Sequence, residues 1–268
     1  MNRKKYKLGL IGCGKMGYAI ARGAVLDSFL ERYEICVYDE DKNVSSICQK
    51  ESFAFMNSSQ ETALNSHIVL LAVRPQDCDA VLDLLKDTPI DCLVSIVTGV
   101  SIHYLQEKLN QTPIIRAMPN TPLQIAEGAT ALCMSANCHA DDYDFVYQMF
   151  NTMGVTRTIP ENQMEDIIAV HGSTPAYVYY IIDCLLKDAV SRGIEEEAAR
   201  DLLVQTFVGS AELLKQNRKK PLDDFIDEVC SKGGTTIEAI DEMKRQNMSR
   251  IIHDCNEKCI DKAKKLGK

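Results

Sequence analysis

The chain has 268 residues, of which 46% are apolar and 25% are charged, the balance of an ordinary globular protein with one or two domains. Its formal net charge of −8 argues against nucleic acid or an anionic membrane as the main partner. The sequence contains no apolar run long enough to span a membrane, and its basic start is not followed by the apolar stretch of a signal peptide. We therefore expect a cytoplasmic protein.

The first predicted strand ends in a glycine-rich turn. The apolar run Leu8–Ile11 is followed by Gly12-Cys13-Gly14-Lys15-Met16-Gly17, which has the spacing G-x-G-x-x-G, and then by a helical stretch. In a dinucleotide-binding turn the first glycine permits the tight bend, the second lets a pyrophosphate approach the backbone, and the third lets helix and strand pack closely. The anion would rest on the free N–H groups at the helix start. We predict that residues 12–17 bind a nicotinamide dinucleotide.

Asp39 ends the second predicted strand, Tyr33–Tyr38, and lies 22 residues after Gly17. At this distance a carboxylate can accept hydrogen bonds from the adenosine ribose hydroxyls. Together with Glu40 and Asp41 it would also repel a 2′-phosphate, so the sequence favours NADH over NADPH, although Lys42 would soften the discrimination. The alternative is that the three acids form a solvated loop that caps the next helix.

Further strands and helices alternate up to residue 159. We expect strands at 53–55, 67–73, 93–97, 113–118, 130–134 and 154–159, and helices at 44–50, 81–86 and 101–109, the last capped by Ser101. This alternation predicts a parallel, doubly wound sheet of the Rossmann type, which binds ligands beyond the carboxyl ends of its strands. Besides the glycine turn and Asp39, these ends carry Arg74-Pro75, Thr98-Gly99 and Met118-Pro119-Asn120.

From Pro160 onward the pattern is helical, so we predict a dinucleotide-binding domain at 1–159 and a helical domain at 160–268. Helices are expected at 164–170, 176–191, 195–215, 221–230, from 237, and at 248–265, with a break at His171–Pro175. Ser231-Lys232-Gly233-Gly234-Thr235-Thr236 precedes one of these helices. Paired glycines and two threonines at a helix start can bind an anion, although an ordinary capped helix start has the same pattern.

Eleven cysteines are scattered along the chain without a C-x-x-C spacing. Cys255 and Cys259 lie one helical turn apart near His253, but zinc would need a fourth ligand that the sequence does not show. We expect reduced thiols that fill small gaps in the core, and no metal site.

Five motifs in this order resemble pyrroline-5-carboxylate reductases, and the resemblance covers essentially the whole chain. They are the glycine turn, Leu71-Ala72-Val73-Arg74-Pro75-Gln76, Arg116-Ala117-Met118-Pro119-Asn120-Thr121-Pro122, His171-Gly172-Ser173-Thr174-Pro175-Ala176-Tyr177 and Gly233-Gly234-Thr235-Thr236. The resemblance implies hydride transfer from NADH or NADPH to the C=N carbon of a cyclic imine, which gives L-proline. It also implies a homodimer or larger assembly joined through the helical domain.

The resemblance assigns roles to residues as well. The substrate carboxylate would bind at the helix start with Ser231, Thr235 and Thr236, and Gly234 and Asn120 would also contact the substrate. The Thr236 hydroxyl would reach the ring nitrogen as the catalytic group. His171 is a candidate proton donor, but we favour the interpretation that it caps the break in its helix. The remaining cofactor contacts would come from Ser59, Ala72, Arg74, Pro75 and Thr98.

Several positions depart from the family pattern: Arg74 replaces a lysine, Ser59 an asparagine, Thr174 a glycine and Lys232 a proline. In addition, Asp39 stands where members that favour NADPH carry small or basic residues.

Three other functions are considered. Hydroxyacid dehydrogenases are disfavoured, because their catalytic lysine has no counterpart in residues 176–186. A reductase of a related cyclic imine and a non-catalytic NAD-binding homologue are the remaining alternatives.

Overall fold

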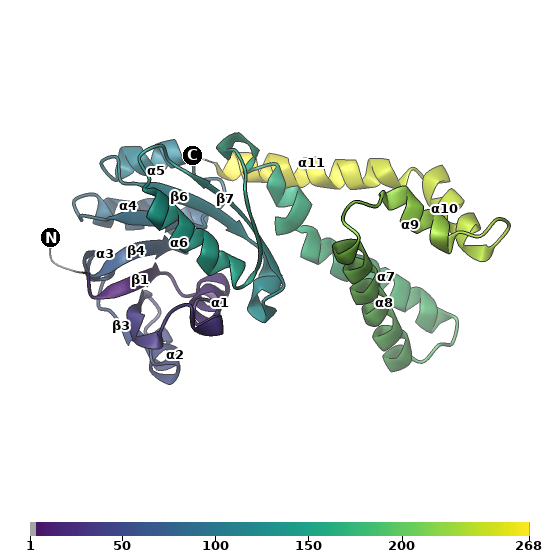
Figure 1. The fold of residues 1–268 in the computed structure, drawn as a ribbon, viewed down its shortest axis with the longest axis horizontal. Helices are drawn as coiled ribbons and strands as arrows, with labels where there is room; N and C mark the ends of the chain where they lie inside the picture. The colour runs from purple at the N-terminus through teal and green to yellow at the C-terminus, as the bar shows by residue number, and fades with distance from the viewer. Residues whose placement is uncertain (1–3, 268) are drawn as a thin grey trace. The chain divides into compact units, whose positions relative to one another are not determined.

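The computed structural model describes residues 4–267 and divides the chain into two compact units (Figure 1). The first comprises the chain up to Pro175 together with the residues from Cys259 onward, and the second is Ala176–Lys258. Among the described residues, no helix is long and apolar enough to cross a membrane. Within the same range, no group of three or more His, Cys, Asp or Glu side chains is arranged to hold a metal ion.

The first unit is built on an eight-stranded sheet in the order β3-β2-β1-β4-β5-β6-β7-β8. The strands are β1 (Tyr6–Ile11), β2 (Ile35–Tyr38), β3 (Ala54–Phe55), β4 (Ser66–Leu71), β5 (Cys92–Ser95), β6 (Ile114–Pro119), β7 (Gly128–Met134) and β8 (Gly154–Thr158). The strands β1 to β6 pair in parallel, whereas β7 runs antiparallel to β6. The expectation of a parallel sheet is therefore wrong at β7. The segment between β6 and β7 holds only the short 3-10 helix Thr121–Ile125, and a parallel crossover needs a dozen or more residues.

Helices cover the sheet because its central strands are apolar on both faces. In β4, Ile68 and Leu70 belong to one buried cluster, while Val69 and Leu71 belong to the other. This alternation has the period of two that a strand requires. The covering helices are α1 (Lys15–Gly23), α2 (Val44–Glu51), α3 (Ser59–Asn65), α4 (Cys78–Leu85), α5 (Ile102–Lys108) and α6 (Ala140–Asn151). The Ser101 cap of α5 is confirmed, because its hydroxyl accepts a hydrogen bond from the Tyr104 N–H at 3.1 Å.

Residues 160–175 belong to the same compact unit as the sheet. Arg116 of β6 is 3% exposed, and its guanidinium bonds to Glu161 at 2.9 Å and Glu165 at 2.8 Å. A buried cation needs such partners, so this segment is held against β6. The first compact unit thus reaches Pro175, and the domain boundary at 159 stays a prediction. A π-helical turn (Ile168–Gly172) overlaps the end of the helix expected at 164–170.

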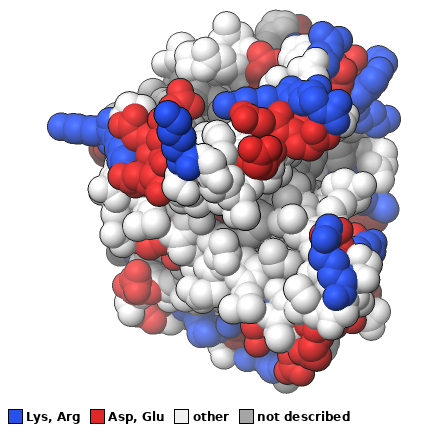
Figure 2. Space-filling view, turned by 90° about the vertical axis from the view of Figure 1, so that its right-hand side faces the viewer, with Lys and Arg blue, Asp and Glu red and all other residues white. Residues whose placement is uncertain are grey.

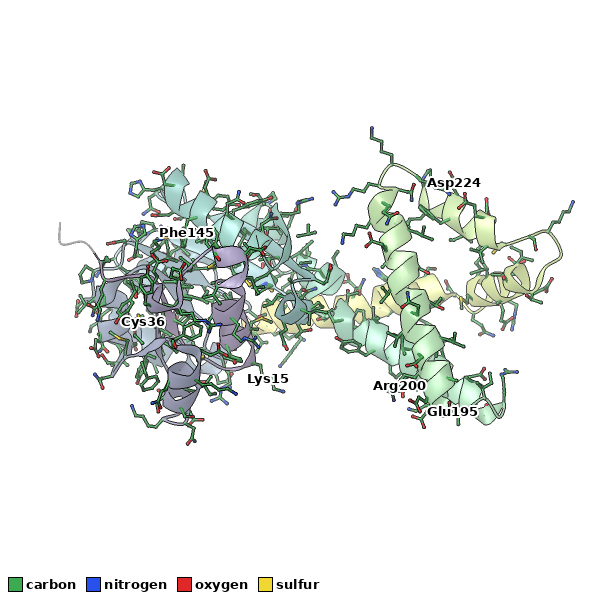
Figure 3. All side chains as sticks on the ribbon, turned by 60° about the horizontal axis from the view of Figure 1, so that its bottom comes forward. Lys15, Cys36, Phe145, Glu195, Arg200 and Asp224 are labelled. Atoms are coloured by element: carbon green, nitrogen blue, oxygen red, sulfur yellow. The ribbon has the colours of Figure 1, made fainter. Side chains whose placement is uncertain are left out.

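The remaining helices are α7 (Thr174–Ser191), α8 (Glu196–Gln216), α9 (Leu222–Val229), α10 (Thr235–Arg245) and α11 (Met248–Leu266). Glu195 begins α8 by accepting hydrogen bonds from the N–H groups of Glu197 (2.9 Å) and Ala198 (2.7 Å) (Figure 3). Large apolar side chains on these helices are exposed, among them Leu202 (69%) and Ile251 (57%). Figure 2 shows a broad area without charged side chains on one face of the molecule. Exposed apolar surface of this kind marks an interaction site.

The close packing of Gly154 against the backbone of β7 can be tested by substitution. Its φ is +137°, and a Cβ built on it would lie 2.5 Å from the backbone nitrogen of Gly128 in β7. We expect Gly154→Ala to lower the free energy of unfolding by about 3 kcal/mol in denaturant titrations. Gly172→Ala is the control, because its Cβ would meet only Ile168 at 3.7 Å. It should cost less than about 1 kcal/mol, and equal losses for both variants would contradict the prediction.

His67 makes stability depend on pH. Its Nδ1 lies 3.1 Å from Asp91 Oδ2 and its Nε2 lies 2.7 Å from Asp142 Oδ1. Burial lowers the pKa of His67, but the hydrogen bonds to the two carboxylates raise it by more, so the net shift is upward. A raised pKa stabilises the fold below the ordinary His value of about 6.5, and this contribution is lost as pH rises through the folded-state pKa.

We therefore expect His67→Gln to destabilise the protein more at pH 5.5 than at pH 8.5. Urea titrations at both values measure the difference. His103→Gln is the control, because the His103 side chain is 82% exposed and faces only Glu107 on its own helix. A loss for His67→Gln that is the same at both pH values would contradict the assignment.

Candidate functional site

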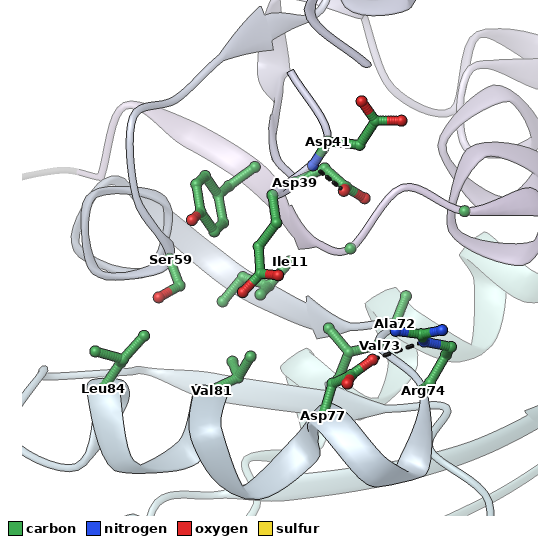
Figure 4. Close-up of a pocket in the computed structure, with 14 residues that line it drawn as sticks. Ile11, Asp39, Asp41, Ser59, Ala72, Val73, Arg74, Asp77, Val81 and Leu84 are labelled. Atoms are coloured by element: carbon green, nitrogen blue, oxygen red, sulfur yellow. Dashed lines mark hydrogen bonds and ion pairs between the residues drawn. The ribbon is translucent and has the colours of Figure 1, made fainter. Parts of the chain in front are cut away.

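A cavity of about 380 Å³ lies at the carboxyl ends of β1, β2 and β4 (Figure 4). It brings together six of the residues predicted to bind the cofactor: Gly12, Gly14, Asp39, Ser59, Ala72 and Arg74. The other predicted residues do not line it. Cys13 lies in the glycine turn, Lys15, Met16 and Gly17 form the first turn of α1, Pro75 begins a 3-10 turn, and Thr98 follows β5. Parallel sheets bind nucleotides at this edge, so the cavity is the candidate dinucleotide site.

The three glycines of the turn have different roles. Gly12 has a φ of +94°, and a Cβ on it would lie 2.6 Å from the Ala72 carbonyl oxygen. A Cβ on Gly17 would lie 2.5 Å from the Gly12 carbonyl oxygen. A Cβ on Gly14 would have no described atom within 4 Å apart from its chain neighbours and its own helix. The fold therefore requires Gly12 and Gly17, whereas Gly14 leaves open space at the start of α1, where a pyrophosphate would approach.

The Asp39 carboxylate hydrogen bonds to the glycine turn. Its Oδ2 accepts a hydrogen bond from the Cys13 N–H at 2.6 Å, and its Oδ1 accepts one from the Asp41 N–H at 2.9 Å. The sequence did not reveal the first of these contacts, which joins the end of β2 to the turn after β1. Each carboxylate oxygen can accept a further bond, so a ribose hydroxyl remains compatible with this arrangement.

The charges that line the cavity are mostly negative. Four acidic residues contribute to the lining: Asp39, Glu40, Asp41 and Asp77. Arg74 contributes a positive charge. The Arg74 Nε donates to Asp77 Oδ2 at 2.7 Å, so that charge is already partly neutralised (Figure 4). Such a lining suits ribose hydroxyls better than an additional phosphate.

Asn120 and His171 connect the end of β6 to the π-helical turn. The Asn120 amide accepts from the Ala129 N–H at 2.8 Å and donates to the His171 carbonyl at 3.1 Å. The His171 ring nitrogens face the carbonyls of Met118 (2.7 Å) and Ile167 (3.1 Å). Both side chains therefore hold backbone in place, and the substrate role predicted for Asn120 stays a prediction.

In the second unit, a glycine-rich turn at residues 231–234 precedes α10. Gly233 has a φ of +71°, and the Gly234 N–H donates to the Ser231 carbonyl at 2.9 Å. Gly234 occupies the N-cap position and supplies no capping side chain to the first turn, which begins with Thr235 and Thr236. This leaves N–H groups and hydroxyls at the positive end of a helix, which is the arrangement expected for binding a carboxylate.

The glycine turn, the cavity at the carboxyl edge and the helical region that follows define an NAD(P)-dependent oxidoreductase. Residues 7–99 match the family model for NADP oxidoreductases dependent on coenzyme F420, and residues 161–266 match the model for pyrroline-5-carboxylate reductase dimerisation.

Curated relatives extend the match over the whole chain. The chain is 32% identical to the pyrroline-5-carboxylate reductase of Aquifex aeolicus, covering 97% of each chain, and 32% identical to that of Escherichia coli, covering 98% of each. The chain belongs to the pyrroline-5-carboxylate reductase family.

Solved structures agree with this assignment. The pyrroline carboxylate reductase of Plasmodium falciparum with NADP bound superposes with a TM-score of 0.90 at 29% identity, covering 100% of both chains. The Streptococcus pyogenes enzyme superposes with a TM-score of 0.88 at 31% identity, covering 97% of this chain and 98% of that one.

Gly14 allows cofactor binding to be tested apart from folding. We expect Gly14→Ala to change the denaturation midpoint little, because, apart from its chain neighbours and its own helix, the Cβ would meet none of the described atoms within 4 Å. The dissociation constant for NADH should rise at least about tenfold, because the methyl group occupies the approach of the pyrophosphate. Fluorescence titration with NADH measures the affinity, and an unchanged dissociation constant would contradict the site.

Proposed function

We propose that this protein reduces the C=N bond of 1-pyrroline-5-carboxylate to L-proline, the last step of proline biosynthesis. The observation that carries this proposal is the match over nearly the full length to curated reductases of that name. A nicotinamide cofactor, when bound, would supply the hydride for the imine carbon, and one proton would go to the ring nitrogen. We also propose that the enzyme acts in the cytoplasm.

The residues of this chain would hold the two reactants. Gly12 permits the tight turn, Gly14 leaves room for the dinucleotide backbone, and the first turn of α1 offers N–H groups to its pyrophosphate. Ala72, Pro75 and Thr98 follow strands at the same edge of the sheet. On the substrate side, Ser231, Gly234 and Thr235 surround the start of α10, where a carboxylate would accept backbone N–H bonds.

Thr236 is the proposed catalytic contact. A hydroxyl that hydrogen bonds to the ring nitrogen orients the imine, and a protonated imine accepts hydride without a strong general acid. His171 fits a proton donor poorly, because both of its ring nitrogens face backbone carbonyls. Thr174 is also engaged locally, since its hydroxyl donates to the carbonyls of Ala169 (3.0 Å) and Val170 (2.8 Å).

We further propose that NADH is preferred and that the protein is at least a homodimer. The acidic lining of the cavity supports the first point, although a relative has been crystallised with NADP. The match of residues 161–266 to a dimerisation model, together with the exposed apolar side chains of the later helices, supports the second.

The function is tested by following the oxidation of NADH and NADPH with pyrroline-5-carboxylate and the purified chain. The proposal requires turnover with at least one cofactor, and proline as the product. If both cofactors bind and neither is consumed, the chain is not this reductase.

A variant series tests Thr236. We expect Thr236→Val to lower kcat/KM for pyrroline-5-carboxylate by about 10–100-fold, the cost of one hydrogen bond to a charged group. Thr236→Ser keeps the hydroxyl and should stay within about threefold of the parent. NADH affinity should not change in either variant. Equal activity of the Val and Ser variants would contradict the proposed hydrogen bond from Thr236 to the ring nitrogen.

Glu40 allows the cofactor preference to be tested without disturbing the glycine turn. We expect Glu40→Gln to raise kcat/KM for NADPH by about 3–10-fold, because one repulsive charge is removed, and to change that for NADH less than about twofold. Asp87→Asn removes the same charge in the turn before β5, at the opposite edge of the sheet, and should change neither value. An unaltered NADPH/NADH ratio in Glu40→Gln would contradict the electrostatic explanation.

A further inference from the structure

The last turn of α11 packs on the loop between β5 and α5. Gly99 lies in this loop with a φ of +78°, and it is buried. A Cβ built on Gly99 would lie 2.9 Å from the Gly267 backbone nitrogen and 3.0 Å from the Ala263 carbonyl oxygen. An alanine would therefore fit only if one of the two segments moved. The two backbones approach as closely as a glycine permits.

Buried apolar packing holds the end of α11 in this position. Ala263 is 4% exposed and belongs to the same buried cluster as Val97 and Val100. These two valines are the residues on either side of Thr98 and Gly99. The apolar contact and the backbone contact thus involve the same short loop.

Two polar contacts attach the same part of α11 to residues 160–175. The Lys264 Nζ lies 3.1 Å from Asp166 Oδ1, and the Cys259 thiol lies 3.0 Å from the Ser173 hydroxyl. The Lys264 and Asp166 side chains are both more than half exposed, so their ion pair contributes at most about 1 kcal/mol. The buried Ala263 is therefore the better position at which to disturb the contact.

The loop that α11 contacts lies at the carboxyl edge of the sheet, as the cofactor cavity does. In the sheet order β3-β2-β1-β4-β5, the sequence of strands reverses between β1 and β4, and a dinucleotide crosses the edge at such a point. The predicted role of Asp39 puts the adenosine half at the end of β2. The nicotinamide half would then extend past β4 toward the loop after β5, which carries Thr98.

We propose that the last turn of α11 is a positioning element for the nicotinamide half of the cofactor. It acts through Gly99, because the close contact fixes the loop that presents Thr98 to the dinucleotide. The adenosine half is held separately, by the glycine turn and Asp39. This inference rests on the proposed function, which supplies the identity of the cofactor and the role of Thr98.

The experiment measures two dissociation constants of the full-length protein by calorimetry, one for NADH and one for ADP-ribose, which lacks the nicotinamide ring. Ala263→Gln places a larger, polar side chain in the buried contact. We expect it to raise the dissociation constant for NADH by about 5–10-fold and that for ADP-ribose by less than about twofold. Lys262→Gln is the matched control, because it places the same side chain at the preceding, exposed position. Ala263→Ser, which is close to alanine in size, should bind both ligands like the parent.

Gly99→Ala tests the contact from the side of the loop and should show the same selective loss of NADH affinity. Gly193→Ala is its control: the φ of Gly193 is +86°, but its Cβ would have no described atom within 4 Å apart from its chain neighbours. It should change neither dissociation constant.

The proposal is overturned if Ala263→Gln and Gly99→Ala leave NADH affinity unchanged, or if they weaken NADH and ADP-ribose equally. An equal loss would mean that the contact supports the fold as a whole. Both ligands are measured without substrate, so the result does not depend on imine turnover. A parent protein that bound neither ligand would overturn the cofactor site itself, and a parent that bound both without reducing the imine would overturn only the proposed function.

Discussion

The close approach of backbone around Gly12 is the constraint on which the cofactor cavity depends. The Gly12 N–H donates to the Tyr38 carbonyl at 2.9 Å, and the Ala72 N–H donates to the Ile11 carbonyl at 2.8 Å. The turn is therefore bonded on both sides to the ends of β2 and β4. Because a Cβ at Gly12 would collide with the Ala72 carbonyl, this approach is open only to glycine. The contacts that join the central strands thus also shape the cavity.

Asp39 connects this turn to the charge of the cavity. Its carboxylate is bonded to the N–H groups of Cys13 and Asp41, and it also contributes negative charge to the cavity. One side chain therefore has a structural and an electrostatic effect, and a substitution at Asp39 would alter both. Glu40 also lines the cavity and is more exposed, so the two effects can be separated there.

The two edges of the sheet differ in their polar groups. The carboxyl edge carries the glycine turn and the acidic cavity, while the amino edge carries His67 between Asp91 and Asp142. The helical region has a different character, because within Ala176–Lys258 the buried side chains described are Leu186 and Ala199. A helical unit with so little buried apolar surface gains stability by covering its apolar faces in an assembly.

Local patterns in the sequence determined the glycine turn, the strands β1 to β6, the Ser101 cap and the long helices, because each depends on residues close together in the chain. The full set of motifs also determined the family. Only the tertiary structure decided the antiparallel direction of β7, the packing of residues 160–175 on Arg116, and the contacts of Asn120 and Asp39. These features depend on partners distant in sequence, such as Asp39 with Cys13 and Asn120 with His171. Pattern and spacing carry no information about such partners, because folding alone brings them within hydrogen-bonding distance.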